Sequence, residues 1–463
     1  MRFRILVLLF LSATACAQQG ERLTHTTTPG GLNSDEQRIV SWVGDHMDEF
    51  EALLEAQVNM NSGTMNPTGV RAVSDALAKQ FDAIGFDTRW IALPESAGRS
   101  GHLFASIDGD KGPKILAIGH LDTVFEPGDA FNRYQHDGNI ARGPGIADMK
   151  SGNLIILFAL RALRENGLLD GAQIQVAFTG DEENPGEPLS VVRKDLIAAG
   201  EWADIALGFE GGARDVDDDG NTRVEYATIA RRSSSDWIVE VTGKQAHSSV
   251  IFSDNVGAGA AFEASRILHD FYELVRGEEY LTFNAGSILA GTDVDYDAPQ
   301  TRGTVFGKTN VVPSRAVVHG GIRTISNEQL ERARQKMRAI VADNLPGTSA
   351  TIRFGEGYPA MSPTVGNQAL QAMLSDINQS LGGTPMPALD PSRRGAADIS
   401  FVAPLTDSLA GLGAYGSGAH SPREALELDS VPLATQRAAL LLYRLIHGGY
   451  QPALDNKAGT PKR

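Results

Sequence analysis

Residues 119–151 read GHLDTVFEPGDAFNRYQHDGNIARGPGIADMKS, and the rest of the chain is organised around this stretch. The apolar run before it, residues 114–118 (KILAI), is typical of a short buried strand. Because successive side chains of a strand point to opposite faces, His120 and Asp122 project to the same side. A histidine beside a carboxylate suits a metal ligand whose ring tautomer the acid fixes. With Asp148 in the glycine-rich turn that follows, the stretch predicts a metal site; a strand that ends in solvated polar residues is the alternative.

Two further predicted strands also end in carboxylates. The β-branched run 173–179 is followed by Glu182 and Glu183, and the run 204–209 is followed by Glu210. In an open α/β sheet, ligands bind beyond the carboxyl ends of the strands. Three successive strands that end in ligand-type residues therefore favour one site at one edge of a sheet over three unrelated solvated ends.

The composition is that of a globular protein with more than one domain. The chain has 463 residues, of which 42% are hydrophobic and 21% charged, and this length exceeds what one ordinary core supports. A net charge of -16 argues against a nucleic-acid surface, because phosphate binding needs clustered Lys and Arg. Beyond the N-terminus, no apolar stretch is long enough for an integral membrane span.

The first 17 residues have the layout of a secretory signal peptide. Two arginines precede the apolar run 5–11, and small residues follow as far as Ala17. We therefore expect an exported protein, periplasmic or secreted, that is cleaved after Ala15 or Ala17. Cleavage before Cys16, the single cysteine, would instead allow a lipid anchor.

The hydrophobic periodicity divides the rest of the chain into a first domain and an insertion. Residues 34–232 alternate amphipathic helices with apolar strands, which predicts an α/β catalytic domain. Residues 233–347 predict a compact β-α-β-β-α unit, which we interpret as an inserted lid. Residues 348–450 then return to the first domain, with a strand at 350–354 and a final helix at 432–446.

The assembled motifs resemble one enzyme family. They are H-x-D at His120 and Asp122, Asp148 in GPGIADMKSG, the pair Glu182-Glu183, Glu210, and His420 in GSGAHS. Their order and contexts closely resemble the di-zinc metallopeptidase and amidohydrolase family of folate-cleaving glutamate carboxypeptidase, aminoacylase and succinyl-diaminopimelate desuccinylase. The resemblance runs over nearly the whole chain after the leader. It implies a zinc-peptidase catalytic domain, with a mixed sheet flanked by helices, and an inserted ferredoxin-like α+β domain for dimerisation and lid function.

The resemblance also implies a set of metal ligands. Asp148 would bridge two Zn²⁺ ions, or other divalent metals such as Co²⁺. His120 and Glu210 would complete the coordination of one ion, and Glu183 and His420 that of the other. The peptide bond after the bridging acid is typically cis in this family.

Catalytic and substrate-binding roles follow from the same resemblance. Asp122 would brace the first histidine ligand, and Glu182 would be the general base for a metal-bridging hydroxide. His247 in GKQAHS would reach the active site of a partner subunit as an oxyanion donor, so a homodimer is expected. Asn310 and Arg323 match lid positions that hold the substrate carboxylate, a task that suits the planar fork of arginine.

The chain departs from the glutamate carboxypeptidase branch at two positions. That branch has Arg before the Pro-Ala pair that is here Pro359-Ala360, whereas this chain has Tyr358. It also has Thr or Ser before an Asp in a glycine-rich loop, where this chain has Ala397 before Asp398. Both positions lie near the expected side-chain pocket, so the resemblance does not extend to a preference for glutamate.

These observations predict an exported zinc-dependent metallopeptidase of carboxypeptidase type. Its substrate would be a small molecule or peptide in which an amide bond lies next to a free carboxylate. An N-acyl-amino-acid deacylase or a dipeptidase of the same family is the alternative, because pocket shape decides between them. A catalytically dead exported peptide-binding protein is an alternative of another class, and the presence of Glu182 with all the ligand positions argues against it.

Overall fold

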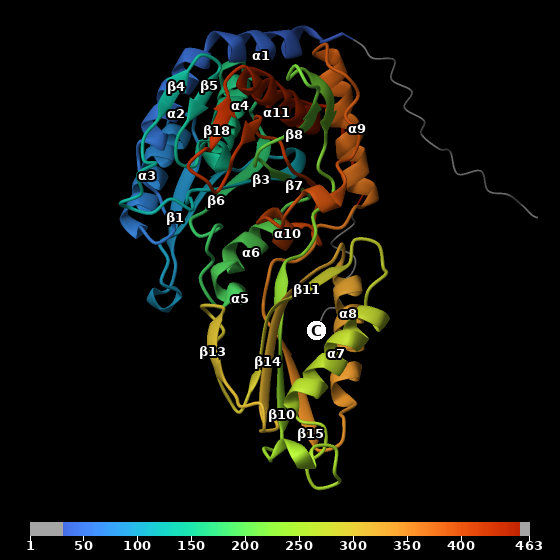
Figure 1. Cartoon of the computed structure of the whole chain (residues 1–463). Coiled ribbons are helices and arrows are strands. Elements are labelled where there is room, and N and C mark those ends of the chain that lie inside the picture. The colour runs from blue at the N-terminus through green and yellow to red at the C-terminus, as the bar shows by residue number, and fades with distance from the viewer. Residues whose placement is uncertain (1–30, 454–463) are drawn as a thin grey trace, which may run out of the picture.

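The computed structural model describes residues 31–453. The predicted signal peptide and Cys16 therefore lie outside the described residues. The chain forms two bodies, one above the other in Figure 1, and the upper body is built around a larger sheet than the lower one. The predicted fold class, an α/β catalytic domain with an inserted α+β domain, is confirmed.

The upper body contains a mixed six-stranded sheet in the order β1-β2-β6-β3-β7-β16. The strands are, in that order, β1 (Asp87–Ala92), β2 (Gly101–Ile107), β6 (Ala172–Thr179), β3 (Lys111–His120), β7 (Ile205–Gly208) and β16 (Asp407–Leu409). β6, β3, β7 and β16 run parallel, whereas β1 and β2 are antiparallel to their neighbours. The central strands are apolar runs buried on both faces, as parallel strands covered by helices are.

Helices cover both faces of this sheet. One face packs against a core to which α1 to α4, α9 and α11 contribute buried side chains, and the other face packs against α6 and α10. The helices of the upper body are α1 (Ser34–Asp45), α2 (Met47–Val58), α3 (Pro67–Ala83), α4 (Ser151–Glu165), α5 (Leu189–Val192), α6 (Lys194–Trp202), α9 (Val365–Ser380), α10 (Ile399–Val402) and α11 (Ser430–His447). α4 is buried on nearly all sides. A helix in this position carries apolar residues around its whole circumference, whereas a surface helix carries them on one face only.

The lower body is an antiparallel sheet in the order β11-β14-β10-β15, covered on one face by two helices. The elements are β10 (Ser235–Gly243), α7 (Ala260–Leu274), β11 (Thr282–Gly291), β14 (Arg315–Arg323), α8 (Asn327–Ala342) and β15 (Thr348–Phe354). The alternate residues Trp237, Val239 and Val241 of β10 are buried in its core, as expected of a sheet with one packed face. We call this body the lid.

One predicted boundary of the lid is wrong. The sequence predicts that the strand at 350–354 belongs to the catalytic domain, but β15 pairs with β10 through the register Ala350↔Val241. The reason is that Ala350, Ile352 and Phe354 alternate with polar residues and pack against the core of the lid. A half-buried strand carries this pattern whichever sheet it joins, so the sequence did not exclude the first domain.

Smaller elements complete the structure. A four-stranded sheet joins β17 (Gly416–Ser417), β18 (Ala425–Glu427), β5 (Ile140–Arg142) and β4 (Gln135–Asp137). Two hairpins are formed by β8 (Ala213–Val216) with β9 (Thr222–Tyr226), and by β12 (Asp293–Asp297) with β13 (Arg302–Phe306). The short helical turns are η1 (Glu95–Ala97), η2 (Ile146–Lys150), η3 (Ser248–Val250) and η4 (Pro391–Arg393). Within residues 31–453, no helix combines the length and the apolar character needed to cross a membrane.

Gly152, in the first turn of α4, gives a test of this packing. A Cβ at Gly152 would lie 2.1 Å from the backbone oxygen of Phe209, the residue that follows β7. Helix propensity alone would make alanine better than glycine by up to about 1 kcal/mol, but overpacking typically costs about 1–3 kcal/mol. We therefore expect Gly152→Ala to lower the free energy of unfolding, measured by thermal or urea denaturation.

Gly44 in α1 is the matched control. A Cβ at this helical position would meet nothing within 4 Å, so Gly44→Ala should leave the stability equal or raise it by up to about 1 kcal/mol. If both substitutions shifted the unfolding midpoint upward, the tight approach of α4 to β7 would be contradicted.

Candidate metal centre

Parallel strand order brings the predicted ligands to one edge of the sheet. His120, the last residue of β3, is in register with Thr179 at the end of β6. The adjoining β7 ends at Gly208, so Glu210 follows at the same edge. His420 and Asp148 arrive from outside this sheet, and the pairing of β18 with β5 brings their two segments together.

The carboxylate of Asp148 lies between two histidines. Nε2 of His120 is 3.2 Å from Oδ1 of Asp148, and Nε2 of His420 is 3.2 Å from Oδ2. The same nitrogen of His420 is 3.0 Å from Oε2 of Glu183. Each oxygen of Asp148 therefore faces a different imidazole. Glu183 lies next to His420, on the Oδ2 side of the Asp148 carboxylate.

This set of atoms fits divalent cations. One ligand atom from each of His120, Asp148 and Glu183 lies within 4.8 Å of the others, and imidazole nitrogens with carboxylate oxygens are a donor set that zinc accepts. Hydrogen bonds to Asp148 and Glu183 raise the pKa of His420 to about 10. The negative potential that holds a proton on this ring is also the potential that would hold a cation among these atoms.

Glu210 borders the same small cavity as His120 and Glu182 but is engaged by a residue that the sequence analysis missed. Its Oε2 atom is 2.5 Å from Nη2 of Arg231, which is 2% exposed. Arg231 also donates to the main-chain oxygen of Gly395 at 3.2 Å. The ion pair fixes the orientation of the Glu210 carboxylate. Arg231 stands in the pair Arg231-Arg232, between two apolar residues and a serine run, and this context gave no sequence signal for the role.

Asp122 is 1% exposed and organises the residues around it. Nδ1 of His120 is 3.0 Å from the main-chain oxygen of Asp122 and 3.5 Å from its carboxylate, so the main chain makes the closer brace. The carboxylate accepts hydrogen bonds from the backbone N–H groups of Glu182 at 3.0 Å and Glu183 at 3.1 Å. It also accepts from the hydroxyl of Thr64 at 2.6 Å. Asp122 thus holds the histidine and the acid pair at once.

Glu182 has the environment of a proton-transfer group. Burial raises its pKa well above the usual range; His120 opposes this effect, and neighbouring carboxylates that include Glu210 add to it. A carboxyl group whose pKa is raised toward neutrality can both accept and release a proton in that pH range.

Glu424, the second residue that no sequence signal indicated, holds the turn that carries Asp148. Its carboxylate is 1% exposed and accepts from the backbone N–H groups of Gly145 at 3.2 Å, Ala147 at 2.8 Å and Asp148 at 3.0 Å. The peptide bond between Asp148 and Met149 is cis, as the resemblance implies. Glu424 follows His420 by four residues in the chain, so one side chain links both ligand segments.

The lid residues lie apart from this cluster in the single chain. The exposed His247 bonds through Nδ1 with the hydroxyl of Ser249 at 2.8 Å, and the N–H of Ser248 donates to the main-chain oxygen of Asn310 at 2.9 Å. Arg323 ends β14 opposite Thr282 and is exposed. In the described part of the chain, His247, Asn310 and Arg323 form no hydrogen bond or ion pair with the residues of the metal cluster. Their predicted roles stay predictions.

Comparison with known proteins shows that the chain is similar to metallopeptidases. The family model described as Peptidase family M20/M25/M40 matches residues 116–444. Carboxypeptidase G2 of Pseudomonas sp. (strain RS-16) is 26% identical over 452 residues, which cover 95% of this chain and 96% of that protein. Succinyl-diaminopimelate desuccinylase of Bordetella petrii is 26% identical over 368 residues, 77% of this chain and 87% of that protein.

A solved structure with the same fold is that of the aminopeptidase PepT from Bacillus cereus. It aligns with a TM-score of 0.68 at 17% sequence identity and covers 86% of this chain and 98% of that one. At this identity the likeness concerns the fold.

Asp122 gives the test of how the centre is held. In Asp122→Asn, one of the two side-chain oxygens that accept from Glu182 and Glu183 becomes an NH₂ group, which cannot accept a hydrogen bond. We expect the affinity for Zn²⁺ to fall about 10- to 100-fold, measured by competition with a chelating indicator. Asp137→Asn, an exposed position in β4 with the same change of charge, is the control and should bind as the parent does. Equal affinities in the two variants would contradict this organising role.

Proposed function

Because this chain belongs to the peptidase family M20/M25/M40 and is a hydrolase of the metallopeptidase and amidohydrolase type, we propose that it cleaves an amide bond next to a free carboxylate. One observation carries the metal-dependent part of the proposal: the two oxygens of Asp148 face His120 and His420 separately. This is the arrangement required of a carboxylate that bridges two cations.

We further propose that the cations are two Zn²⁺ ions. His120, Asp148 and Glu210 would hold one ion, and Asp148, Glu183 and His420 the other. When bound, such a pair supplies a water acidified toward neutral pH and a polarised substrate carbonyl. The ion pair of Glu210 with Arg231 occupies Oε2 and leaves Oε1 for a cation, which supports this assignment.

The side chains of the protein would then move the proton and bind the substrate. Glu182 would accept a proton from the attacking water and return it to the departing amine, for which its raised pKa is suited. Arg323 and Asn310 of the lid would bind the free carboxylate. His247 would donate a hydrogen bond to the negative oxygen of the tetrahedral intermediate, and we propose that it does so in the other subunit of a homodimer.

The substrate class is supported most broadly by the carboxypeptidase G2 likeness, which extends over 95% of this chain. A deacylase acting on N-acyl amino acids is the second candidate, because proteins named succinyl-diaminopimelate desuccinylase also match. A peptide-binding protein without catalysis is disfavoured because Glu182 and every proposed ligand are present. For the location, we propose export to the periplasm or the medium, on the layout of residues 1–17.

Glu182→Gln tests the proposed reaction. The amide keeps the size of the side chain but cannot accept the proton, so hydrolysis of a panel of dipeptides and N-acyl amino acids should fall about 100- to 10,000-fold. The bound metal, measured by elemental analysis, should stay at the parent value. Glu187→Gln, on the same loop and exposed, is the control and should keep the parent rate. A parent protein that binds these compounds without turnover would instead favour the binding protein.

Metal removal tests the cofactor. Dialysis against a chelator should abolish hydrolysis and lower the thermal unfolding midpoint, because cations that bind the folded state stabilise it by mass action. Two equivalents of Zn²⁺ or Co²⁺ per chain should restore both properties. Full activity in protein shown to be free of metal would refute the assignment, and restoration by one equivalent would refute the second ion.

A further inference from the structure

Two segments connect the lid with the catalytic domain, and they are bonded to each other. Ser234, on the way into the lid, exchanges two backbone hydrogen bonds of 2.9 Å each with Tyr358 on the way out. Arg231 and Met361 are paired in the same way, at 2.9 and 3.0 Å. We call residues 355–361 the return connector. Its Gly357 is packed so tightly that a Cβ would lie 2.1 Å from the main-chain oxygen of Ser234.

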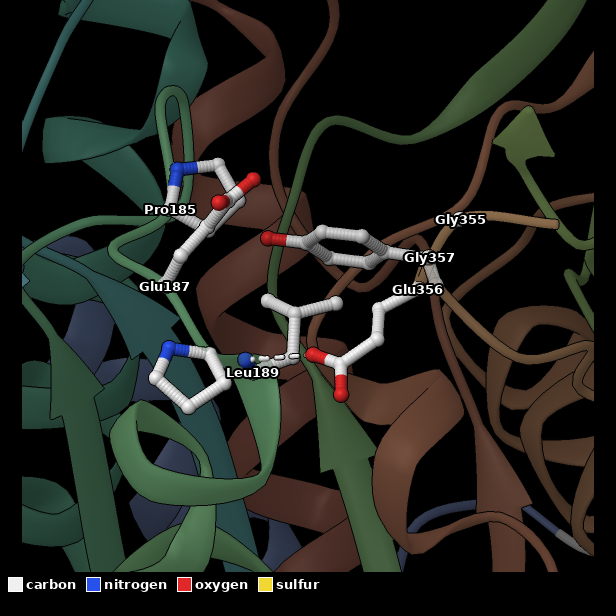
Figure 2. A pocket seen from close by; sticks show the side chains of 8 residues that line it. Pro185, Glu187, Leu189, Gly355, Glu356 and Gly357 are labelled. Carbon is white, nitrogen blue, oxygen red and sulfur yellow. Dashed lines mark hydrogen bonds between the residues drawn. The ribbon is translucent and has the colours of Figure 1, made fainter. Parts of the chain in front are cut away.

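The return connector faces the loop that follows Glu182 and Glu183. Between them lies a cavity of about 630 Å³ that is lined by residues 185 and 187–189 on one side and 355–358 on the other. Figure 2 shows Glu356 reaching across this cavity to the backbone nitrogen of Leu189, which donates a hydrogen bond of 2.8 Å. The connector thus bonds to Leu189, at the C-terminal end of the loop that begins at Glu182.

Tyr358 bonds to Glu182, at the N-terminal end of the same loop. Its hydroxyl donates to the main-chain oxygen of Glu182 at 2.9 Å and accepts from Nη2 of Arg193 at 2.9 Å. The ring packs edge-on against Phe401, with 4.9 Å between the ring centroids. The hydroxyl is therefore fixed by a donor on one side and an acceptor on the other, and the ring is fixed by packing.

Arg193 anchors this arrangement in the interior. Its side chain is 0% exposed and forms ion pairs with Asp181 at 2.5 Å and Asp398 at 2.8 Å. It also donates to the main-chain oxygen of Asp181 at 3.1 Å. Tyr358 and Arg193 thus bind main-chain carbonyl groups of the loop around Glu182. Asp122 accepts hydrogen bonds from the N–H groups of the same loop.

We propose that Tyr358 is a positioning residue that sets the orientation of Glu182 from the return connector, so that the placement of the general base depends on the placement of the lid. This inference rests on the proposed function, because it takes Glu182 as the base. The motifs of the sequence do not predict this role for Tyr358. The glutamate carboxypeptidase branch has Arg at the corresponding position, before the Pro-Ala pair. Substitution of the tyrosine removes neither a proposed metal ligand nor the proposed base, because its hydroxyl bonds to the main-chain oxygen of Glu182 and to Arg193.

Tyr358→Phe removes only the hydroxyl and leaves the ring packed on Phe401. A mispositioned base should lower kcat by about 10- to 100-fold, with KM within about twofold of the parent value and the bound metal unchanged. Tyr296→Phe is the matched control: its hydroxyl bonds with Nδ1 of His319 at 2.6 Å inside the lid, so it loses a comparable bond away from Glu182 and should keep the parent kcat.

Hydrogen exchange provides a readout that does not depend on turnover. With the carbonyl of Glu182 released, a peptide covering residues 180–190 should exchange about tenfold faster in Tyr358→Phe than in the parent or in Tyr296→Phe. Unchanged exchange in this peptide would overturn the proposal, as would unchanged kcat in an active enzyme or a loss of kcat that follows a loss of bound metal. Absence of amide hydrolysis in the metal-loaded parent would refute the proposed function, and faster exchange would then still support the positioning of this loop by Tyr358.

Discussion

The site depends on one carboxylate that is shared between two imidazoles. The oxygens of Asp148 can face His120 and His420 at equal distances only if the main chain at Asp148 is fixed. That constraint is met by Glu424, which accepts three backbone hydrogen bonds from the turn. Because Glu424 lies on the segment of His420, the turn and the second histidine are positioned by one buried group.

The strand order concentrates negative charge at one edge of the sheet, and the structure offsets that charge locally. Asp122 is stabilised by backbone N–H groups, and Glu210 by Arg231. Arg193 forms ion pairs with both Asp181 and Asp398, next to the loop that carries Glu182 and Glu183. Asp148 and Glu183 are compensated by His420, on the side where a divalent cation is the natural counter-charge. The acids are therefore held in defined orientations despite their mutual repulsion.

The lid is a separate packing unit, and hydrogen bonds connect it through the return connector to the loop that carries Glu182. Its core around Trp237 does not merge with the cores of the catalytic domain. The return connector is one of the two segments that join the units, and two of its side chains, Glu356 and Tyr358, bond to the loop between Glu182 and Leu189. The lid and the loop that carries Glu182 are thereby linked through a short path of directional bonds.

From the residues themselves, strand periodicity and ligand chemistry predicted an α/β domain whose strands end in acids at one edge of a sheet, because both are local properties of the chain. The complete set of residues at the centre, His420 included, followed from the resemblance to a known family. The sheet to which residues 350–354 belong, and the support given by Arg231, Glu424 and Tyr358, were decided only by the tertiary structure. Each of these depends on a partner 21 or more residues away, as between Arg231 and Glu210, or as many as 279, as between Glu424 and Gly145. A pairing over such a distance leaves no period or spacing in the chain from which it could be read.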